Sequence, residues 1–168
     1  MNKRVAVIGS NGFVGTNIVR TLQENAYDTV KVTRESDPDI IQTCSHVIHC
    51  ANSPSRYKAE LDPHFDLEES LNKTQDLLSR LDLRQTKFIL ISSISARTEP
   101  ETIYGKNRLE CEKLTIASGG YFSRLGYMYS HERIYGALSD IYFDKTVYLD
   151  GNSRYSFSSV DWNAKKVV

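Results

Sequence analysis

The sequence lacks several features that mark special classes of protein. Its 21 basic and 21 acidic residues cancel, so there is no excess of positive charge for binding nucleic acid or an anionic membrane. No apolar run approaches the roughly 20 residues of a membrane span, and the amino terminus lacks the pattern of a signal peptide. We therefore expect a cytoplasmic protein with neither a nucleic-acid nor a membrane partner.

Cysteine is also scarce. The three cysteines, Cys44, Cys50 and Cys111, show no C-x-x-C spacing, and this usage is typical of reduced thiols in a cytosol. His46 and His49 lie three residues apart on an expected strand, so their side chains point to opposite faces and cannot hold one metal ion together. The sequence therefore predicts no metal site.

What the sequence does contain is an alternation of short apolar runs and amphipathic segments. The apolar runs predict strands over 4–8, 29–33, 46–50, 87–91 and 121–125. Helical spacing covers 13–22, 67–81 and 104–117, and a short helix can begin within 36–39. Strands that alternate with helices imply right-handed crossovers and a parallel sheet. We expect an α/β chain with a three-layer Rossmann fold around a central, mostly parallel sheet.

The pattern weakens after Gly126. The polar, tyrosine-rich stretch 127–142 is a candidate substrate loop. Two later runs, 145–149 and 154–160, are compatible with strands on either side of a turn at Asp150-Gly151. We expect residues 1–168 to form a single Rossmann domain with a minimal substrate-side region at about 127–160.

A glycine-rich turn joins the first predicted strand to the first predicted helix. In this context Gly9 permits the tight turn, Gly12 lets the backbone approach a pyrophosphate, and Gly15 lets the helix pack against the strand. Backbone N–H groups and the helix dipole then favour an anion. The alternative is a turn without a ligand. The candidate cofactor-binding residues of the turn are Gly9, Ser10, Asn11, Gly12, Phe13, Val14 and Gly15.

The end of the second predicted strand bears on the choice of cofactor. In nicotinamide-dependent Rossmann folds, an acidic residue about 20 positions after the turn binds the ribose hydroxyls and favours NAD. Thr33 stands at that position and Arg34 follows it. Because a guanidinium pairs well with a 2′-phosphate, these two residues favour NADP. Glu35 lies next to them, so NAD remains the alternative cofactor. The competing interpretation of Arg34 is that it is only a solvated charge in a loop.

The G-x-x-G-x-x-G spacing resembles that of the extended short-chain dehydrogenase/reductase family, which includes nucleotide-sugar epimerases, dehydratases and reductases. Further matches follow in the family's order: V-I-H-C-A-N at 47–52, L-I-S-S at 90–93, Y-G-K-N-R-L-E-C-E-K-L at 104–114, R-L-G-Y-M-Y at 124–129 and S-S-V-D-W at 158–162. The first of these segments resembles a cofactor-contact segment, which implies that Cys50, Ala51 and Asn52 bind the cofactor.

The resemblance also implies a catalytic set. Tyr104 matches the tyrosine of the family's Y-x-x-x-K motif, Arg108 replaces its lysine, and Ser93 matches its catalytic Ser or Thr. Tyr104 and Arg108, four residues apart on one helix face, are also candidate cofactor contacts. The alternatives are a packing role for Tyr104, an ion pair of Arg108 with Glu112, and a backbone-capping role for Ser93.

The sequence departs from the family pattern in four places. Arg108 stands for lysine, and Ser70 stands where the family has an asparagine. The segment between the second and third predicted strands is short, as if one strand–helix unit were missing. The chain also ends soon after Val160. These departures indicate a compact or truncated member.

The expected function is NADP-dependent hydride transfer, with NAD as the alternative cofactor. The resemblance implies an oxidoreductase or epimerase whose small-molecule substrate is a sugar or nucleotide-sugar. It also implies a homodimer that pairs through helices at 66–83 and 104–117. The alternative is a non-catalytic NAD(P)-binding sensor or assembly partner with a degenerate active site.

Overall fold

The computed structural model describes residues 3–130, 137–147, 150, 152, 154 and 156–168. In this part of the chain, a five-stranded sheet has the order β2-β1-β3-β4-β5, and all of its neighbouring strands are parallel. The predicted Rossmann-type α/β fold is therefore confirmed. The strands are β1 (Arg4–Ile8), β2 (Asp28–Val32), β3 (His46–His49), β4 (Lys87–Ser93) and β5 (Tyr121–Leu125).

The strand order reverses between β1 and β3. The chain passes from β1 outward to β2 and then returns to β3 on the other side of β1. Ile8 pairs with both Val32 and His49, so these three strands end at the same level. Ligands of open α/β sheets bind beyond the carboxyl ends of the strands at such a reversal. A ligand site is therefore expected among the residues that follow β1, β2 and β3.

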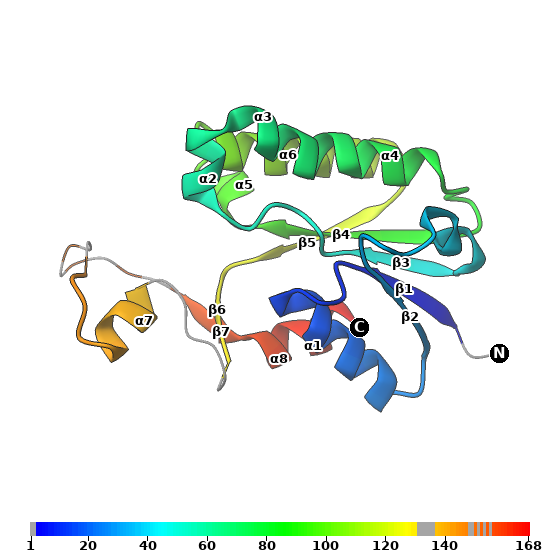
Figure 1. Cartoon of the computed structure of the whole chain (residues 1–168), viewed down its shortest axis with the longest axis horizontal. Coiled ribbons are helices and arrows are strands. Elements are labelled where there is room, and N and C mark those ends of the chain that lie inside the picture. Colours follow the sequence, from blue (N-terminus) through cyan, green and yellow to red (C-terminus); the bar gives the residue numbers. More distant parts are fainter. Residues whose placement is uncertain (1–2, 131–136, 148–149, 151, 153, 155) are drawn as a thin grey trace.

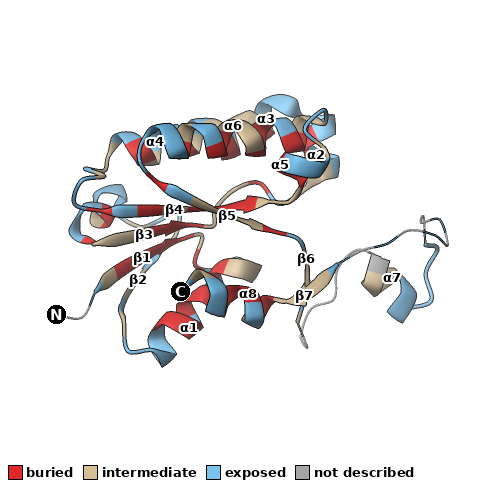
Figure 2. Ribbon diagram, turned by 180° about the vertical axis from the view of Figure 1, so that it is seen from behind, coloured by how far each residue is buried: buried red, intermediate tan, exposed pale blue. Residues whose placement is uncertain are grey.

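Helices cover both faces of the sheet (Figure 1). On one face lie α1 (Phe13–Glu24) and α8 (Val160–Val167), which pack together. The other face carries α2 (Arg56–Leu61), α3 (Pro63–Leu67), the π-helical turn η2 (Glu68–Asn72), α4 (Lys73–Ser79), α5 (Ser95–Thr98) and α6 (Ile103–Ala117). Figure 2 shows buried residues along the strands and on the helix surfaces turned toward them. The predicted three layers are present.

The core consists of two clusters, one on each face of the sheet. In β1, Val5 and Val7 belong to the cluster with Ile18 of α1, whereas Ala6 and Ile8 belong to the other cluster. This division follows from the two-residue period of a strand, whose successive side chains point to opposite faces. Because both faces are covered, the strand must be apolar at every position, which explains the continuous apolar run.

Two helical segments differ in detail from the prediction. The helix expected over 67–81 runs through α3, the π-helical turn η2 and α4. The short helix expected near 36–39 is a 3₁₀ helix, η1 (Pro38–Thr43), whose cap Asp37 accepts a hydrogen bond from the Asp39 N–H at 2.9 Å. This helix is the connection between β2 and β3.

The strand pair expected around Asp150-Gly151 is confirmed only in part, because the second run, 154–160, contains a strand, and Gly151 lies outside the described residues. Residues 145–147, the described part of the first run, form no strand, and β7 (Phe157–Ser159) instead pairs in parallel with β6 (Tyr127–Tyr129). The second run then changes to a helix, because the Ser159 hydroxyl caps α8 by accepting from the Trp162 N–H at 3.1 Å. Within the stretch 127–142, α7 (Ala137–Tyr142) lies beyond β6 and β7 (Figure 1).

Candidate active site

The glycine turn lies between the end of β1 and the start of α1. Gly9 has a φ of +80°, in the left-handed region that favours glycine, and a Cβ there would lie 3.0 Å from Ala51. A Cβ on Gly15 would collide with the Gly9 carbonyl oxygen. On Gly12 it would lie 3.2 Å from that oxygen, a much milder contact. Packing alone therefore requires glycine at positions 9 and 15, but much less strongly at position 12.

The start of α1 fits an anion. Gly12 caps the helix without a side chain, and the first turn carries no acidic residue. The first N–H groups of a helix have no partner within it, and their dipoles point outward. The turn itself is held by the Gly12 N–H, which donates to the Gly9 carbonyl at 2.9 Å. A backbone cradle without a capping side chain suits a pyrophosphate.

The candidate residues after β2 lie in a short turn. The Thr33 N–H donates to the Ser36 hydroxyl at 2.9 Å, and the Thr33 hydroxyl accepts from the Glu35 N–H at 3.3 Å. The Arg34 side chain is 88% exposed, and its Nη2 lies 3.4 Å from Glu69 Oε2. Arg34 is therefore accessible to a ligand and is held only loosely.

Sequence reasoning missed two charged residues beside Arg34. Lys73 Nζ lies 2.5 Å from Glu69 Oε2 and also donates to the Ala51 carbonyl at 3.3 Å. The hydrogen bond from Lys73 is the largest influence that lowers the pKa of the Glu69 carboxyl. The Glu69 carboxylate thus lies between the Arg34 and Lys73 cations, at the place where a 2′-phosphate is expected. The four-residue spacing of Glu69 and Lys73 was a signal of their pairing, but not of their approach to Arg34 and Ala51.

The residues after β3 connect neighbouring strands. The Cys50 N–H donates to the Ile8 carbonyl at 2.9 Å, and Asn52 Nδ2 donates to the Ile91 carbonyl at 3.3 Å. Burial raises the pKa of the Cys50 thiol to about 12, so the thiol stays neutral. Burial, with the nearby charges of Lys73 and Arg108, lowers the pKa of His49 to about 3. Among the described residues, no group of His, Cys, Asp and Glu could hold a metal ion.

Tyr104 and Arg108 lie together near the start of α6, as predicted. Thr102 caps this helix by accepting from the Gly105 N–H at 3.0 Å. The Arg108 guanidinium carbon lies 4.6 Å from the centroid of the Tyr104 ring, within the range of a cation–π contact. Both side chains are buried, Arg108 almost completely.

Arg108 takes a partner that sequence reasoning did not identify. Its Nη2 donates to the Ser53 carbonyl at 2.5 Å and lies 3.6 Å from Asp66 Oδ1, a fully buried carboxylate. The alternative partner Glu112 instead pairs with Arg124 at 2.6 Å. Asp66 lies in the first turn of α3, a position typical of an exposed acid, and no pattern in the sequence indicated its burial.

Ser93 occupies the carboxyl end of β4 but has a local partner. Its Oγ donates to Ser95 Oγ at 3.2 Å and accepts from the Ser95 N–H at 3.2 Å. This arrangement matches the capping alternative and leaves the hydroxyl half-buried at the strand end.

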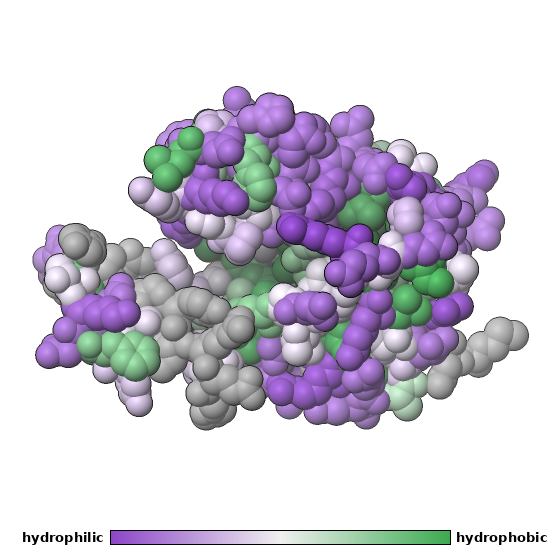
Figure 3. All heavy atoms as spheres, viewed as in Figure 1, coloured by the Kyte–Doolittle hydropathy of each residue, from purple (hydrophilic) through white to green (hydrophobic). Residues whose placement is uncertain are grey.

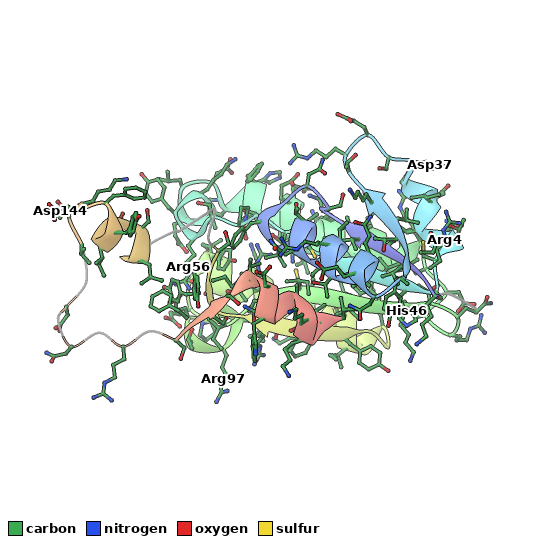
Figure 4. The ribbon with its side chains drawn as sticks, turned by 90° about the horizontal axis from the view of Figure 1, so that it is seen from below. Arg4, Asp37, His46, Arg56, Arg97 and Asp144 are labelled. Carbon is green, nitrogen blue, oxygen red and sulfur yellow. The ribbon has the colours of Figure 1, made fainter. Side chains whose placement is uncertain are left out.

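A cavity of about 410 Å³ lies beside this edge of the sheet. Ile94 and Gly126, which directly follow β4 and β5, line it together with Arg56 and Arg154. Arg56 Nη1 lies 2.8 Å from a Glu99 carboxylate oxygen. Figure 4 places Arg56 at the end of the main body that faces α7, and Figure 3 shows a recess with apolar residues on its floor.

A parallel sheet with a glycine turn at its strand-order reversal defines a Rossmann-type dinucleotide-binding fold. Residues 5–136 match the model of the NAD dependent epimerase/dehydratase family. The chain belongs to that family, which confirms the resemblance inferred from its motifs. Comparison with the curated proteins gives no match. Across the described residues, no helix has both the length and the apolar character needed to cross a membrane.

Solved structures of similar fold cover nearly the whole chain. UDP-N-acetylglucosamine 4-epimerase from Bacillus cereus has a TM-score of 0.79 at 17% identity, over 99% of this chain and 72% of that one. UDP-glucose 4-epimerase from Thermotoga maritima has a TM-score of 0.78 at 18% identity, over 96% and 71%. A dTDP-4-dehydrorhamnose reductase ortholog from Clostridium acetobutylicum has a TM-score of 0.82 at 17% identity, over 98% and 68%.

Proposed function

We propose that this protein is an NADP-dependent oxidoreductase or epimerase that transfers hydride at a carbon of a sugar or nucleotide-sugar. The observation that carries the proposal is the buried Tyr104–Arg108 pair, in a fold whose glycine turn suits a pyrophosphate. Family membership supports the general kind of reaction. Structures of similar fold include a reductase from Bacillus anthracis in complex with NADP, and MoeE5 in complex with UDP-glucuronic acid and NAD.

The glycine turn and the strand ends would hold the cofactor. The first N–H groups of α1 bind the pyrophosphate, which approaches close to the Gly12 backbone, and the residues after β3 line the same edge of the sheet. Thr33 and Arg34 receive the adenosine ribose and its 2′-phosphate, with Lys73 supplying a second positive charge nearby. When bound, the nicotinamide accepts or donates the hydride.

Tyr104 would move the proton that accompanies this transfer. It takes the hydroxyl proton when a sugar alcohol is oxidised and returns it when a carbonyl is reduced. The Arg108 guanidinium over its ring offsets the negative charge that develops on the phenol. Ser93, at the end of β4, orients the substrate oxygen. Two guanidinium groups line the nearby cavity, which suits a substrate that carries phosphate groups.

The variant Tyr104→Phe tests this function. It keeps the ring under Arg108 and removes only the hydroxyl, so turnover should fall by about 10²–10⁴-fold while cofactor affinity changes little. Steady-state turnover on a panel of uridine-, thymidine- and guanosine-diphosphate sugars, with both cofactors, provides the measurement. Equal turnover in the wild type and the variant contradicts the role of Tyr104.

The second candidate function is a non-catalytic NAD(P)-binding sensor or assembly partner. It is favoured by the Arg108 guanidinium, which is already bound to the Ser53 carbonyl and faces Asp66. Cofactor binding without turnover of any sugar in the panel would favour this candidate.

We also propose that residues 1–168 form one domain whose substrate side lies at about 127–160. A homodimer that pairs through the helical segments 66–83 and 104–117 remains a prediction, and the mass in solution tests whether the protein is a dimer.

A further inference from the structure

We propose that Asp66 is a positioning residue that holds the Arg108 guanidinium against Tyr104. The inference rests on the proposed function, because it assigns Arg108 a task that matters for turnover. Asp66 lies in α3 and Arg108 in α6, so the pair joins two helices of the same layer.

Successive residues of α6 approach both oxygens of the carboxylate, one through a hydrogen bond and the other through an ion pair. Asn107 Nδ2 donates to Asp66 Oδ2 at 2.8 Å, and Arg108 Nη2 lies 3.6 Å from Asp66 Oδ1. The hydrogen bond from Asn107 fixes one carboxylate oxygen, and the other oxygen then faces the Arg108 guanidinium. The orientation of the Asp66 carboxylate therefore determines where the Arg108 guanidinium is most stable beside the Tyr104 ring.

Electrostatics gives Asp66 this control. Arg108 is 1% exposed and Asp66 is fully buried, and a buried guanidinium requires a countercharge. Within the described part of the chain, Asp66 is the only carboxylate within 4 Å of Arg108. The Ser53 carbonyl adds a hydrogen bond to the same nitrogen but no net charge. Removal of the Asp66 charge should therefore move the guanidinium away from its place over the Tyr104 ring.

The pair also retains unused hydrogen-bonding capacity. Asp66 Oδ1 and Arg108 Nη1 are buried without a hydrogen-bond partner among the described residues, as are the hydroxyls of Ser53 and Ser70. Buried polar groups in native proteins are nearly always satisfied, and exceptions need an explanation. The π-helical turn η2 directly follows α3, and such turns often occur at functional sites. An unused donor on Arg108 is suited to an oxygen of bound cofactor or substrate.

The variant Asp66→Asn tests the proposal, because it removes the charge and keeps an oxygen that can accept from Asn107. The matched control is Glu112→Gln, which alters a buried carboxylate of α6 that pairs with Arg124. One readout is the side-chain Nε–H resonance of Arg108 in ¹⁵N NMR spectra, assigned by its loss in Arg108→Met. The other readout is turnover at varied cofactor concentration, which gives kcat and the KM for cofactor separately.

Asp66→Asn should shift the Arg108 resonance and lower kcat at least about tenfold, whereas the KM for cofactor should change much less. Glu112→Gln should leave the Arg108 resonance in place. If Asp66 acts through Arg108, the double variant Asp66→Asn/Arg108→Met should have the same kcat as Arg108→Met alone. Should Asp66→Asn fail to fold, Asn107→Ala releases one carboxylate oxygen and should produce a smaller shift and a smaller loss of kcat.

The proposal is overturned if the Arg108 resonance does not move in Asp66→Asn, even if the wild type is active. The same holds for Asn107→Ala where that variant replaces Asp66→Asn. A moved resonance with unchanged kcat in an active enzyme also overturns it. If the wild type turns over no substrate, the proposed function fails separately. A resonance that moves with Asp66 and not with Glu112 still supports the placement of Arg108 by Asp66.

Discussion

Replacement of Gly12 by alanine separates ligand binding at the glycine turn from folding. The added Cβ would lie 3.2 Å from the Gly9 carbonyl oxygen, so the turn must open by only a few tenths of an ångström. The φ of −78° at Gly12 is one that alanine adopts without strain. Because alanine is a poorer helix cap than glycine, we expect a loss of roughly 0.5–1 kcal/mol in the free energy of unfolding.

The expected loss of cofactor binding is larger. In the proposed complex the new methyl group occupies the space through which the pyrophosphate approaches the backbone. A charge-assisted hydrogen bond contributes roughly 1.5–3 kcal/mol, so the loss of one weakens binding by about 10- to 150-fold. NADP and NAD should be affected equally, because both contain the pyrophosphate.

Calorimetric titration with each cofactor measures this effect, and denaturant unfolding checks the fold. Gly15→Ala provides the contrast, since its Cβ would collide with the Gly9 carbonyl oxygen. That variant should lose roughly 1–3 kcal/mol of stability through overpacking. A folded Gly12→Ala variant with wild-type affinity for both cofactors would refute the assignment of the turn as the phosphate site.

Further predictions concern cofactor choice and pH. Arg34→Ala should weaken NADP binding at least about tenfold and leave NAD nearly unchanged. Glu69→Gln should strengthen NADP binding, because it removes the negative charge between Arg34 and Lys73. Titration of the wild type and both variants with NADP and with NAD measures these effects. A wild type that prefers NAD would contradict the prediction. His49 has a pKa of about 3 when folded and a usual value near 6.5 when unfolded. The unfolded state therefore binds the extra proton, and stability falls by up to about 1.4 kcal/mol per pH unit as pH decreases from 6.5 toward 3. His49→Gln should flatten the dependence of the unfolding free energy on pH over this range, and an unchanged slope would contradict the buried neutral imidazole.

The sequence predicted most of the sheet and its glycine turn because local patterns determine both. Strands covered on both faces must be apolar throughout, and Gly9 and Gly15 are required by the backbone itself. The carboxyl-terminal strands were harder to predict, since β7 pairs with β6 through residues far apart in the sequence, such as Tyr127 and Phe157. Local preference for strand over 154–160 did not reveal that the Ser159 hydroxyl begins a helix.

The site was predicted only in part for a similar reason. The spacing of Tyr104 and Arg108 on one helix face implies their proximity directly. Asp66 reaches Arg108, and Glu69 reaches Arg34, only after separate elements pack together, so no local pattern reveals these two contacts. An acid in the first turn of a helix is usually exposed, but Asp66 is fully buried. Only the tertiary structure shows this burial.

The most direct test of the central claim is the fate of deuterium placed on the reacting carbon of a nucleotide-sugar substrate. The wild-type protein is mixed in stoichiometric amounts with oxidised NADP or NAD and each deuterated sugar of the panel, and the nicotinamide is analysed by mass spectrometry. Hydride transfer predicts deuterium on the nicotinamide in the wild type and its near absence in Tyr104→Phe. Bound cofactor that stays free of deuterium with every sugar would contradict the account.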